Sequence, residues 1–353
     1  MSSQYEIKIS GSAPTLFPTD TLYGLVWYGE EEPLEIPKRY PYQGEWGGVL
    51  SNLILLREKY PMPDKLDILW LSIVEKRFYT ISEKFPKPIF EDCWSKFVTK
   101  DNGFGFSHIV IGMAPYGGIA VWFNGYKKAI IMLWTKAKGI NIPMAEFMPN
   151  NPTITLNELC NYYVNSDPRV RENLEKNGLP PRDLFDNYMK QFTYRYQVAF
   201  ERWDEQKGEW KAYDEEEQDK MPELDYIEEA LYDGTHDKLH DGGLMKYHEA
   251  GKPKKLAVQW HVKKSEWSAY FWFEDAAIRA IFDRFYGTHP DTKTDFILRI
   301  DPYSNRYELA MYRYGLREPN VISTSSYQLL VFKNKFECFR SKNYAQERGA
   351  WIW

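Results

Sequence analysis

The sequence predicts an α+β fold in which antiparallel β-sheets carry packed helices, and three observations favour this class. Aromatic side chains make up 17% of the 353 residues, and such side chains suit the half-buried faces of sheets. Apolar runs of strand length recur along the chain, with turn residues between them. Apolar stripes at helical spacing separate some of these runs. With 43% hydrophobic residues, the chain has enough apolar side chains for a large core.

The first clear series of elements begins at Lys65. Leu66–Ile73 is an apolar run that predicts a strand buried on both faces. Proline is tolerated in the first turn of a helix, so Pro86 and Pro88 predict a helix start. The order is strand, strand, helix, strand, turn, strand, at residues 66–73, 78–81, 89–97, 107–113, 115–118 and 119–123.

A second series repeats this order near the C-terminus. Its elements are expected at residues 254–260, 268–273, 278–285, 295–300, 301–305 and 306–312. A Pro-Tyr turn occupies the same place in both series, 49 positions after Leu66 and 46 positions after Leu256. We therefore expect two related strand-strand-helix-strand-strand units, although this order is common enough to recur by coincidence.

These series divide the chain into three expected regions. Residues 1–145 form an N-terminal α+β unit, and residues 251–353 form a C-terminal unit that resembles it. Residues 146–250 form a helical and acidic connecting region. Inside it we expect helices at 152–164, 169–176 and 183–190, then a hairpin of 194–203 and 210–213.

Charge is distributed unevenly. From Glu201 to Glu229 there are 13 acidic and 4 basic residues, a net charge of −9, whereas the whole chain carries −5. Such a run is often a solvated loop. The alternative is an acidic surface that docks on a basic partner, formed by Trp203, Trp210, Tyr213, Asp214, Glu215, Glu216, Glu217 and Asp219.

Motifs for catalysis are missing from the sequence. It has no Walker motif, no nucleophile elbow and no dinucleotide fingerprint. Carboxylates are abundant, but their spacing selects no acid–base pair. Cys93 falls on the apolar stripe of a predicted helix and is expected in the core. We therefore expect a binding protein without catalytic residues or cofactor, rather than an enzyme.

Three of the six histidines lie between His236 and His248. His236 and His240 are four residues apart, and on a helix they would face the same way, as paired zinc ligands often do. Asp237 stands where zinc proteases of this type carry glutamate, and Gly242-Gly243 would end a helix at once. The histidines are weak metal candidates, and a polar connector is the simpler interpretation.

The same sequence features bear on location and partners. Cys93, Cys160 and Cys338 are far apart and fit a reducing compartment. The N-terminal residues contain no apolar signal core, and apolar runs such as Ile109–Ala114 are too short to span a bilayer. The net charge of −5 gives no overall attraction for nucleic acid. We expect a cytoplasmic protein that binds neither nucleic acid nor membrane.

Several segments together resemble a bacterial family of unknown function, DUF2931, over roughly residues 5–145. The segments that carry the resemblance are Ser12–Pro18, Gly44–Gly48, Met62–Trp70, Glu75–Tyr79 and Val110–Trp122. The resemblance implies a type VI secretion-associated immunity protein. Many relatives look like exported lipoproteins, whereas this chain shows no such signal.

The function expected from the resemblance is that of a cytosolic immunity protein, which neutralises a cognate antibacterial effector by direct binding and occlusion. The implied partner is a protein toxin such as a nuclease or a lipase. Two alternatives remain: an effector adaptor or chaperone for the secretion machinery, and an uncharacterised metal-dependent hydrolase that uses the region of His236 and His240.

Overall fold

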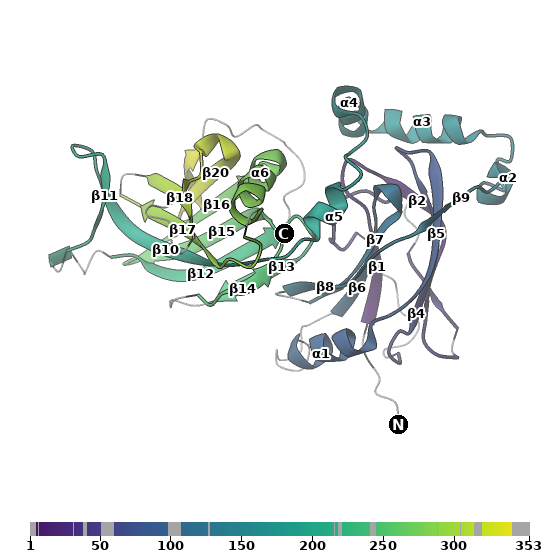
Figure 1. Ribbon diagram of the computed structural model, residues 1–353, viewed down its shortest axis with the longest axis horizontal. Coiled ribbons are helices and arrows are strands. Elements are labelled where there is room, and N and C mark those ends of the chain that lie inside the picture. Colours follow the sequence, from purple (N-terminus) through teal and green to yellow (C-terminus); the bar gives the residue numbers. More distant parts are fainter. Residues whose placement is uncertain are drawn as a thin grey trace. The chain divides into compact units, whose positions relative to one another are not determined.

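The computed structural model shows a protein built mostly of β-strands, in antiparallel and mixed sheets with a few helices (Figure 1). The coarse α+β prediction is thus confirmed. Two compact units divide the chain: unit 1 contains residues 1–189 and 233–235, and unit 2 contains residues 190–232 and 236–353. The structure describes residues 5, 7–30, 32–37, 41–50, 60–97, 107–125, 128–214, 216–217, 221–240, 245–287, 289–303, 305–313 and 320–340.

Unit 1 contains a five-stranded antiparallel sheet in the order β3-β2-β4-β5-β9. Its central strand β4 is buried on both faces, as its apolar sequence predicts. The strands are β2 (Thr19–Trp27), β3 (Leu34–Glu35), β4 (Lys65–Ser72), β5 (Arg77–Lys84) and β9 (Lys138–Ile140).

The second sheet of unit 1 is mixed, with the order β1-β6-β7-β8. Strand β1 lies parallel to β6, and the other two pairs are antiparallel. The sequence did not predict this parallel pair. The strands are β1 (Ile7–Ser12), β6 (Ser107–Met113), β7 (Gly118–Asn124) and β8 (Lys128–Lys136).

Local capping signals define the helices after the sheets of unit 1. Thr155 and Glu158 form a capping box at the start of α3, and Asp167 caps α4, whose first residue is Pro168. The helices are α1 (Lys87–Phe97), α2 (Met144–Phe147), α3 (Leu156–Ser166), α4 (Pro168–Asn177) and α5 (Leu184–Tyr188), with a 3₁₀ turn η1 at Pro115–Gly117.

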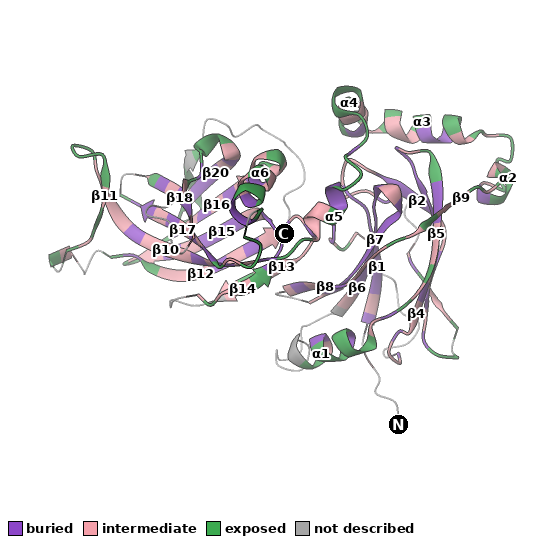
Figure 2. Cartoon of the chain, in the orientation of Figure 1, coloured by how far each residue is buried: buried purple, intermediate pink, exposed green. Residues whose placement is uncertain are grey.

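The core of unit 1 lies between its two sheets, where Trp70 and Phe123 are fully or almost fully buried and α1 contributes Phe90. The outer faces are covered as well. Helix α5 packs Phe185 against Trp46 and β7, and α3 packs Leu159 against β4 and β5. Figure 2 shows buried residues along the strands and exposed ones on α3 and α4.

Unit 2 contains a sheet in the order β13-β12-β15-β16-β20-β21 and a second in the order β11-β10-β17-β18-β19. Strand β10 is parallel to β17 and also pairs with β14. The strands are β10 (Phe192–Asp204), β11 (Glu209–Ala212), β12 (Glu223–Leu231), β13 (His236–His240), β14 (His248–Ala250), β15 (Pro253–Val262), β16 (Ser265–Phe273), β17 (Thr294–Asp301), β18 (Arg306–Arg313), β19 (Asn320–Val321), β20 (Tyr327–Lys333) and β21 (Phe336–Arg340).

One hydrophobic core holds unit 2 together. It joins side chains of both sheets with the buried face of helix α6 (Asp275–Tyr286), where Phe282 packs on Phe192 and Tyr194. A short 3₁₀ turn, η3 (Thr324–Ser326), precedes β20.

At 12 residues, α6 is well below the roughly 20 residues of a membrane span, and no helix in the described parts of the chain has the length and apolarity to cross a bilayer.

The units divide at a different place from the expected regions. Residues 146–189, expected in a connecting region, pack into unit 1 because α3 and α5 bury apolar side chains against its sheets. Residues 190–232 belong to unit 2, where β10 and β12 supply strands of its two sheets.

Candidate functional site

The predicted hairpin in the acidic stretch exists in unit 2. The far half of β10 pairs with β11, so that Trp203 lies directly opposite Trp210. Asp204 shapes the turn, since its Oδ1 accepts hydrogen bonds from the backbone N–H groups of Gln206 and Lys207 at 2.9 and 3.1 Å. Gly208 closes the turn with φ of 68°, which glycine adopts without steric cost. Figure 1 shows this hairpin extending past the neighbouring strands.

A cluster of aromatic and cationic side chains stiffens the hairpin. The Trp203 and Trp210 rings meet edge to face at 5.5 Å. The Arg306 guanidinium, from β18, lies 3.5 Å from the centroid of Trp203. Trp203 is also fixed through its backbone N–H, which donates to Asp301 Oδ2 at 3.0 Å. The aromatic surface is therefore held in place from two neighbouring elements.

Tyr213 continues this surface at the end of β11. Arg202 lies over its ring at 5.3 Å and also forms an ion pair with Glu217. Burial and the nearby Asp301 carboxylate raise the pKa of Tyr213 to about 12, so the hydroxyl is protonated at neutral pH. Tyr213 is thus a neutral, half-buried residue beside charged ones.

The same segment carries several carboxylates. Glu205, Glu209, Asp214 and Glu216 are exposed, whereas Glu217 is partly neutralised by Arg202. The structure thus brings Trp203, Trp210, Tyr213, Asp214, Glu216 and Glu217 into one hairpin region. Glu215 and Asp219, also predicted as contact residues, lie outside the described residues. We call residues 201–217 the acidic hairpin.

Sequence reasoning missed the two arginines that stabilise the acidic hairpin. Arg202 could have been noticed, because it adjoins Trp203 and lies within reach of the acidic run. Arg306 could not, because only the pairing of β17 with both β10 and β18 brings it to Trp203. The indole N–H groups of Trp203 and Trp210 are buried and have no hydrogen-bond partner among the described residues.

His236 and His240 lie in strand β13, not on the helix that a paired metal site requires. Strand residues four apart are separated by about 13 Å, too far for one metal ion to bind both. The described residues contain no group of three or more metal-binding side chains. The helix that would place these two histidines on one face is not formed, so that expectation was wrong.

His248 belongs to a buried polar cluster in unit 2. Its Nε2 lies 3.0 Å from Glu229 Oε1, while the hydroxyls of Tyr194 and Tyr196 donate to Glu229 Oε2 at 3.1 and 2.9 Å. Burial alone would lower the pKa of His248, but the hydrogen bond and charge of Glu229 raise it. The ring also bonds to the backbone of Lys246. The contact with Glu229 and the partial burial of the ring favour a structural ion pair.

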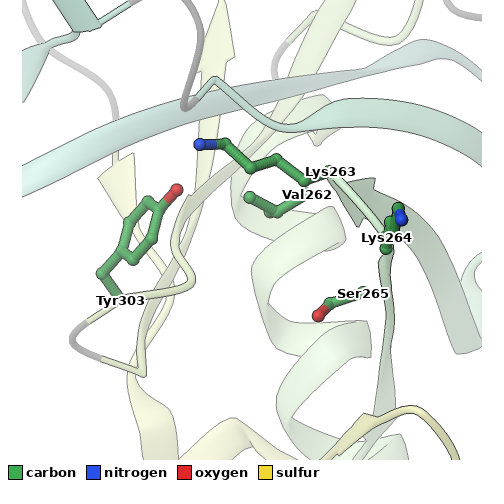
Figure 3. Close-up of a pocket in the computed structure, with 5 residues that line it drawn as sticks. All are labelled: Val262, Lys263, Lys264, Ser265 and Tyr303. Atoms are coloured by element: carbon green, nitrogen blue, oxygen red, sulfur yellow. The ribbon is translucent and has the colours of Figure 1, made fainter.

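A shallow surface cavity of about 580 Å³, mostly open to solvent, lies elsewhere in unit 2, between the β15–β16 turn and the β17–β18 turn. It is lined by Val262, Lys263, Lys264, Ser265 and Tyr303 (Figure 3). Figure 3 shows the Lys263 side chain and the Tyr303 hydroxyl extending toward one another from the two turns. Tyr303 is 55% exposed.

Unit 1 has a Pro-Tyr turn of its own. Tyr116 adopts φ of 59°, which is uncommon for a residue with a side chain, and its N–H donates to Glu75 Oε2 at 2.8 Å. The Tyr116 hydroxyl donates to the carbonyl oxygen of Pro180 at 2.7 Å, and the Arg182 guanidinium lies 5.7 Å from its ring centroid. A segment of the same unit therefore covers this tyrosine.

Comparison with known proteins identifies one family. Residues 8–181 match the model of DUF2931, described as a protein of unknown function. Neither a curated protein nor a solved structure matches the chain. The match contains the segments from Ser12 to Trp122 that carried the sequence resemblance and extends through α3 and α4. The family match thus covers residues 8–181, all of which lie in unit 1.

Proposed function

We propose that this protein is an immunity protein that neutralises a cognate antibacterial effector by binding it, and that the acidic hairpin of unit 2 is the main contact surface. The acidic hairpin carries this proposal. It combines a packed pair of tryptophans with exposed carboxylates in the same segment, and aromatic anchors with a polar rim are common in protein interfaces.

We also propose that the two units arose from one ancestral unit. In unit 1, β1 pairs in parallel with β6, and β2 pairs with β4. In unit 2, β10 pairs in parallel with β17, and β12 pairs with β15. The order strand, strand, helix, strand, strand follows in each, as β4-β5-α1-β6-β7 and β15-β16-α6-β17-β18. A shared parallel pair between strands distant in sequence supports common descent more strongly than the local order does.

On this alignment the acidic hairpin is an insertion. Residues 13–18 connect β1 to β2 in unit 1. The corresponding connection in unit 2 spans residues 201–222, counted from the last β10 pairing with β17. A loop added to a shared scaffold is a common origin for a binding surface, because the scaffold holds the loop without depending on it.

The charge of the hairpin indicates the kind of partner. The stretch from Glu201 to Glu229 carries −9, so it favours a partner surface rich in lysine and arginine. Nucleases present such a surface to nucleic acid. A bound immunity protein would therefore occlude a nuclease cleft with its own carboxylates. The cysteines Cys93, Cys160 and Cys338 are free thiols, which fits an encounter in the reducing cytoplasm.

A rescue experiment tests the proposed function. Open reading frames that neighbour the gene are expressed singly in a bacterial host, with and without this protein. The proposal predicts that one of them stops growth and that this protein restores it, with a stable complex on purification. An adaptor or chaperone would form the complex but leave the effector toxic. Failure of every neighbouring product to be neutralised would contradict the immunity function.

The hydrolase alternative has weaker support. The hydrolase alternative depended on a helix that places His236 and His240 side by side, but both residues lie in a strand. His248 interacts with Glu229 and Lys246. Purified protein with His236→Ala and His240→Ala substitutions provides the test. Full rescue by this double variant is expected for a binding protein, whereas loss of rescue together with loss of a bound metal would favour the hydrolase.

A further inference from the structure

The acidic hairpin ends its sheet with an open strand edge. Strand β11 stands last in the order β11-β10-β17-β18-β19, and among the described residues it pairs only with β10. Its residues are exposed except for Trp210, which is half-buried, and Figure 1 shows the strand extending past its neighbours. An open strand edge is a template for another strand, because its outward N–H and C=O groups can continue the ladder of hydrogen bonds.

The contacts of Trp203 show which backbone groups of β11 face this edge. The Trp203 N–H donates to Asp301 Oδ2 at 3.0 Å, and Asp301 belongs to β17, on the side of β10 opposite to β11. Trp203 and its cross-strand partner Trp210 are therefore a pair without mutual backbone hydrogen bonds. Residues of such pairs direct their N–H and C=O groups away from each other. Because this orientation alternates along a strand, Trp210 and Ala212 both present these groups at the open edge.

The other edge of the hairpin is closed. Asp301 accepts the Trp203 hydrogen bond there, and the Arg306 guanidinium lies 3.5 Å from the Trp203 ring centroid. Strand β11 itself contains no proline, and its pairing with β10 shows no bulge, two features that commonly block strand edges. A strand added to the hairpin would therefore pair with β11.

Charge decides which kind of strand would pair there. The acidic hairpin carries eight acidic and three basic residues, a net charge of −5. A second copy of this chain would bring the same charges to the same edge, so self-pairing is disfavoured. A segment rich in lysine and arginine is favoured instead, because opposite charges stabilise neighbouring strands. Lys211 is the only basic residue of β11, and the carboxylates of the hairpin outweigh it.

We propose that a partner protein binds by adding an extended basic segment to the open edge of β11, with backbone hydrogen bonds to Trp210 and Ala212. Strand addition takes its affinity from main-chain hydrogen bonds and its specificity from alternate side chains. One face of β11 carries Glu209 and the other carries Trp210, so a segment that alternates basic and apolar residues fits both faces. The strand addition rests on the proposed function and adds to it the conformation and chemistry of the bound segment.

A proline at the open edge gives the most specific variant. Proline lacks a backbone N–H, and edge strands tolerate it where that group faces solvent. Ala212→Pro should therefore keep the hairpin but remove a donor from its open edge. The matched control is Asn157→Pro, at an exposed residue in the first turn of α3, where proline is also tolerated. The thermal unfolding midpoint of each variant checks its folding.

Two synthetic peptides of equal charge probe the edge on the full-length protein. One alternates lysine and valine, and the other contains the same residues as a lysine block followed by a valine block. NMR titrations give the dissociation constants, and hydrogen exchange reports on the amides of Trp210 and Ala212. We expect the alternating peptide to bind about tenfold more tightly than the block peptide and to slow the exchange of both amides. Ala212→Pro should weaken its binding about tenfold, and Asn157→Pro should leave it unchanged.

Other results would overturn the proposal. Equal affinity for the two peptides, or binding that leaves the exchange of both amides unchanged, would mean that charge alone attracts them. Absence of binding by either peptide, or full binding to a folded Ala212→Pro variant, would also contradict strand addition. Analytical ultracentrifugation tests self-pairing: a dimer of the native protein that Ala212→Pro dissociates would show that the edge belongs to a second copy of this chain.

The cognate effector separates this proposal from the proposed function. If the native protein binds the effector and the Ala212→Pro variant binds it equally well, the strand-addition proposal fails and the binding function stands. If the native protein binds no effector, the proposed function fails whatever the peptides do.

Discussion

Units 1 and 2 use similar strand pairings but differ in what covers their sheets. In unit 1, α2, α3 and α5 bury apolar clusters on the outer faces, and residues 180–182 cover Tyr116. In unit 2, the buried hydrophobic residues of the described parts form one core, and the acidic hairpin carries exposed carboxylates. The comparison shows that added helices bury the outer faces of unit 1, whereas unit 2 carries an added acidic hairpin, which is the surface that we propose for binding.

The largest expected effect tests whether each unit has its own core. Phe90 in α1 and Phe282 in α6 are both fully buried, in separate hydrophobic clusters. Replacement of either by alanine should cost about 3–5 kcal/mol in the stability of its own unit. Urea denaturation followed by hydrogen exchange assigns the loss to a unit. Equal destabilisation of both units by each variant would show that they unfold as one body.

A smaller loss of stability is expected when the ion pair between Glu229 and His248 in unit 2 is broken. Glu229 is 1% exposed, so His248→Ala leaves its carboxylate buried without a cation. The cost should be about 2–3 kcal/mol, below the value for fully buried pairs because the His248 side chain is 25% exposed.

The pH dependence of this ion pair follows from the raised pKa of His248. Protonation is favoured in the folded state, so the ion pair contributes fully below the unfolded pKa of about 6.5 and is lost as pH rises through the folded value. The stability difference between native protein and His248→Ala should therefore shrink as the pH of urea denaturation rises from 6 to 9. His261→Ala, at a more exposed histidine, is the control with a smaller effect. A difference that grows with pH would contradict this assignment.

The smallest changes in stability are expected for substitutions in the two Pro-Tyr turns. Tyr116→Phe removes the hydrogen bond to the Pro180 carbonyl and should destabilise unit 1 by about 0.5–1.5 kcal/mol. Tyr303→Phe should leave the stability of unit 2 within about 0.5 kcal/mol, as is usual for surface positions. Thermal unfolding of the two variants gives both values. A larger loss for Tyr303→Phe than for Tyr116→Phe would contradict this ranking of the two turns.

Much of the local structure could be predicted from the sequence, because periodicity and turn residues act over short distances. Strand β4, helix α4 and the hairpin around Gly208 follow from such signals. The parallel pairs β1–β6 and β10–β17 could not be predicted, since each joins strands about a hundred positions apart. For His236 and His240, a four-residue spacing fits a helix face and a strand face equally well, and only sheet pairing decides between them.

The candidate site shows the same limit. Trp203, Trp210 and the acidic run stand close together in the sequence and were predicted as one surface. Arg306, which braces Trp203, and Tyr303, which lines the cavity, come from turns and strands far along the chain. Their positions depend on which strands pair in the folded protein, and the spacing of residues in the sequence does not predict that pairing.

The most direct measurement is the affinity for the cognate effector after charge reversal in the acidic hairpin. The variant carries lysine at Glu205, Glu209, Asp214 and Glu216, and a control of equal charge carries lysine at the exposed residues Glu91, Glu146, Glu172 and Asp291. Stopped-flow measurements at low and high salt give the association rates. At low salt the hairpin variant should associate about 10–100-fold more slowly than the native protein, and at high salt the difference should be smaller. The association rate of the control should change by less than about twofold. Unchanged association and full rescue by the hairpin variant would contradict the account.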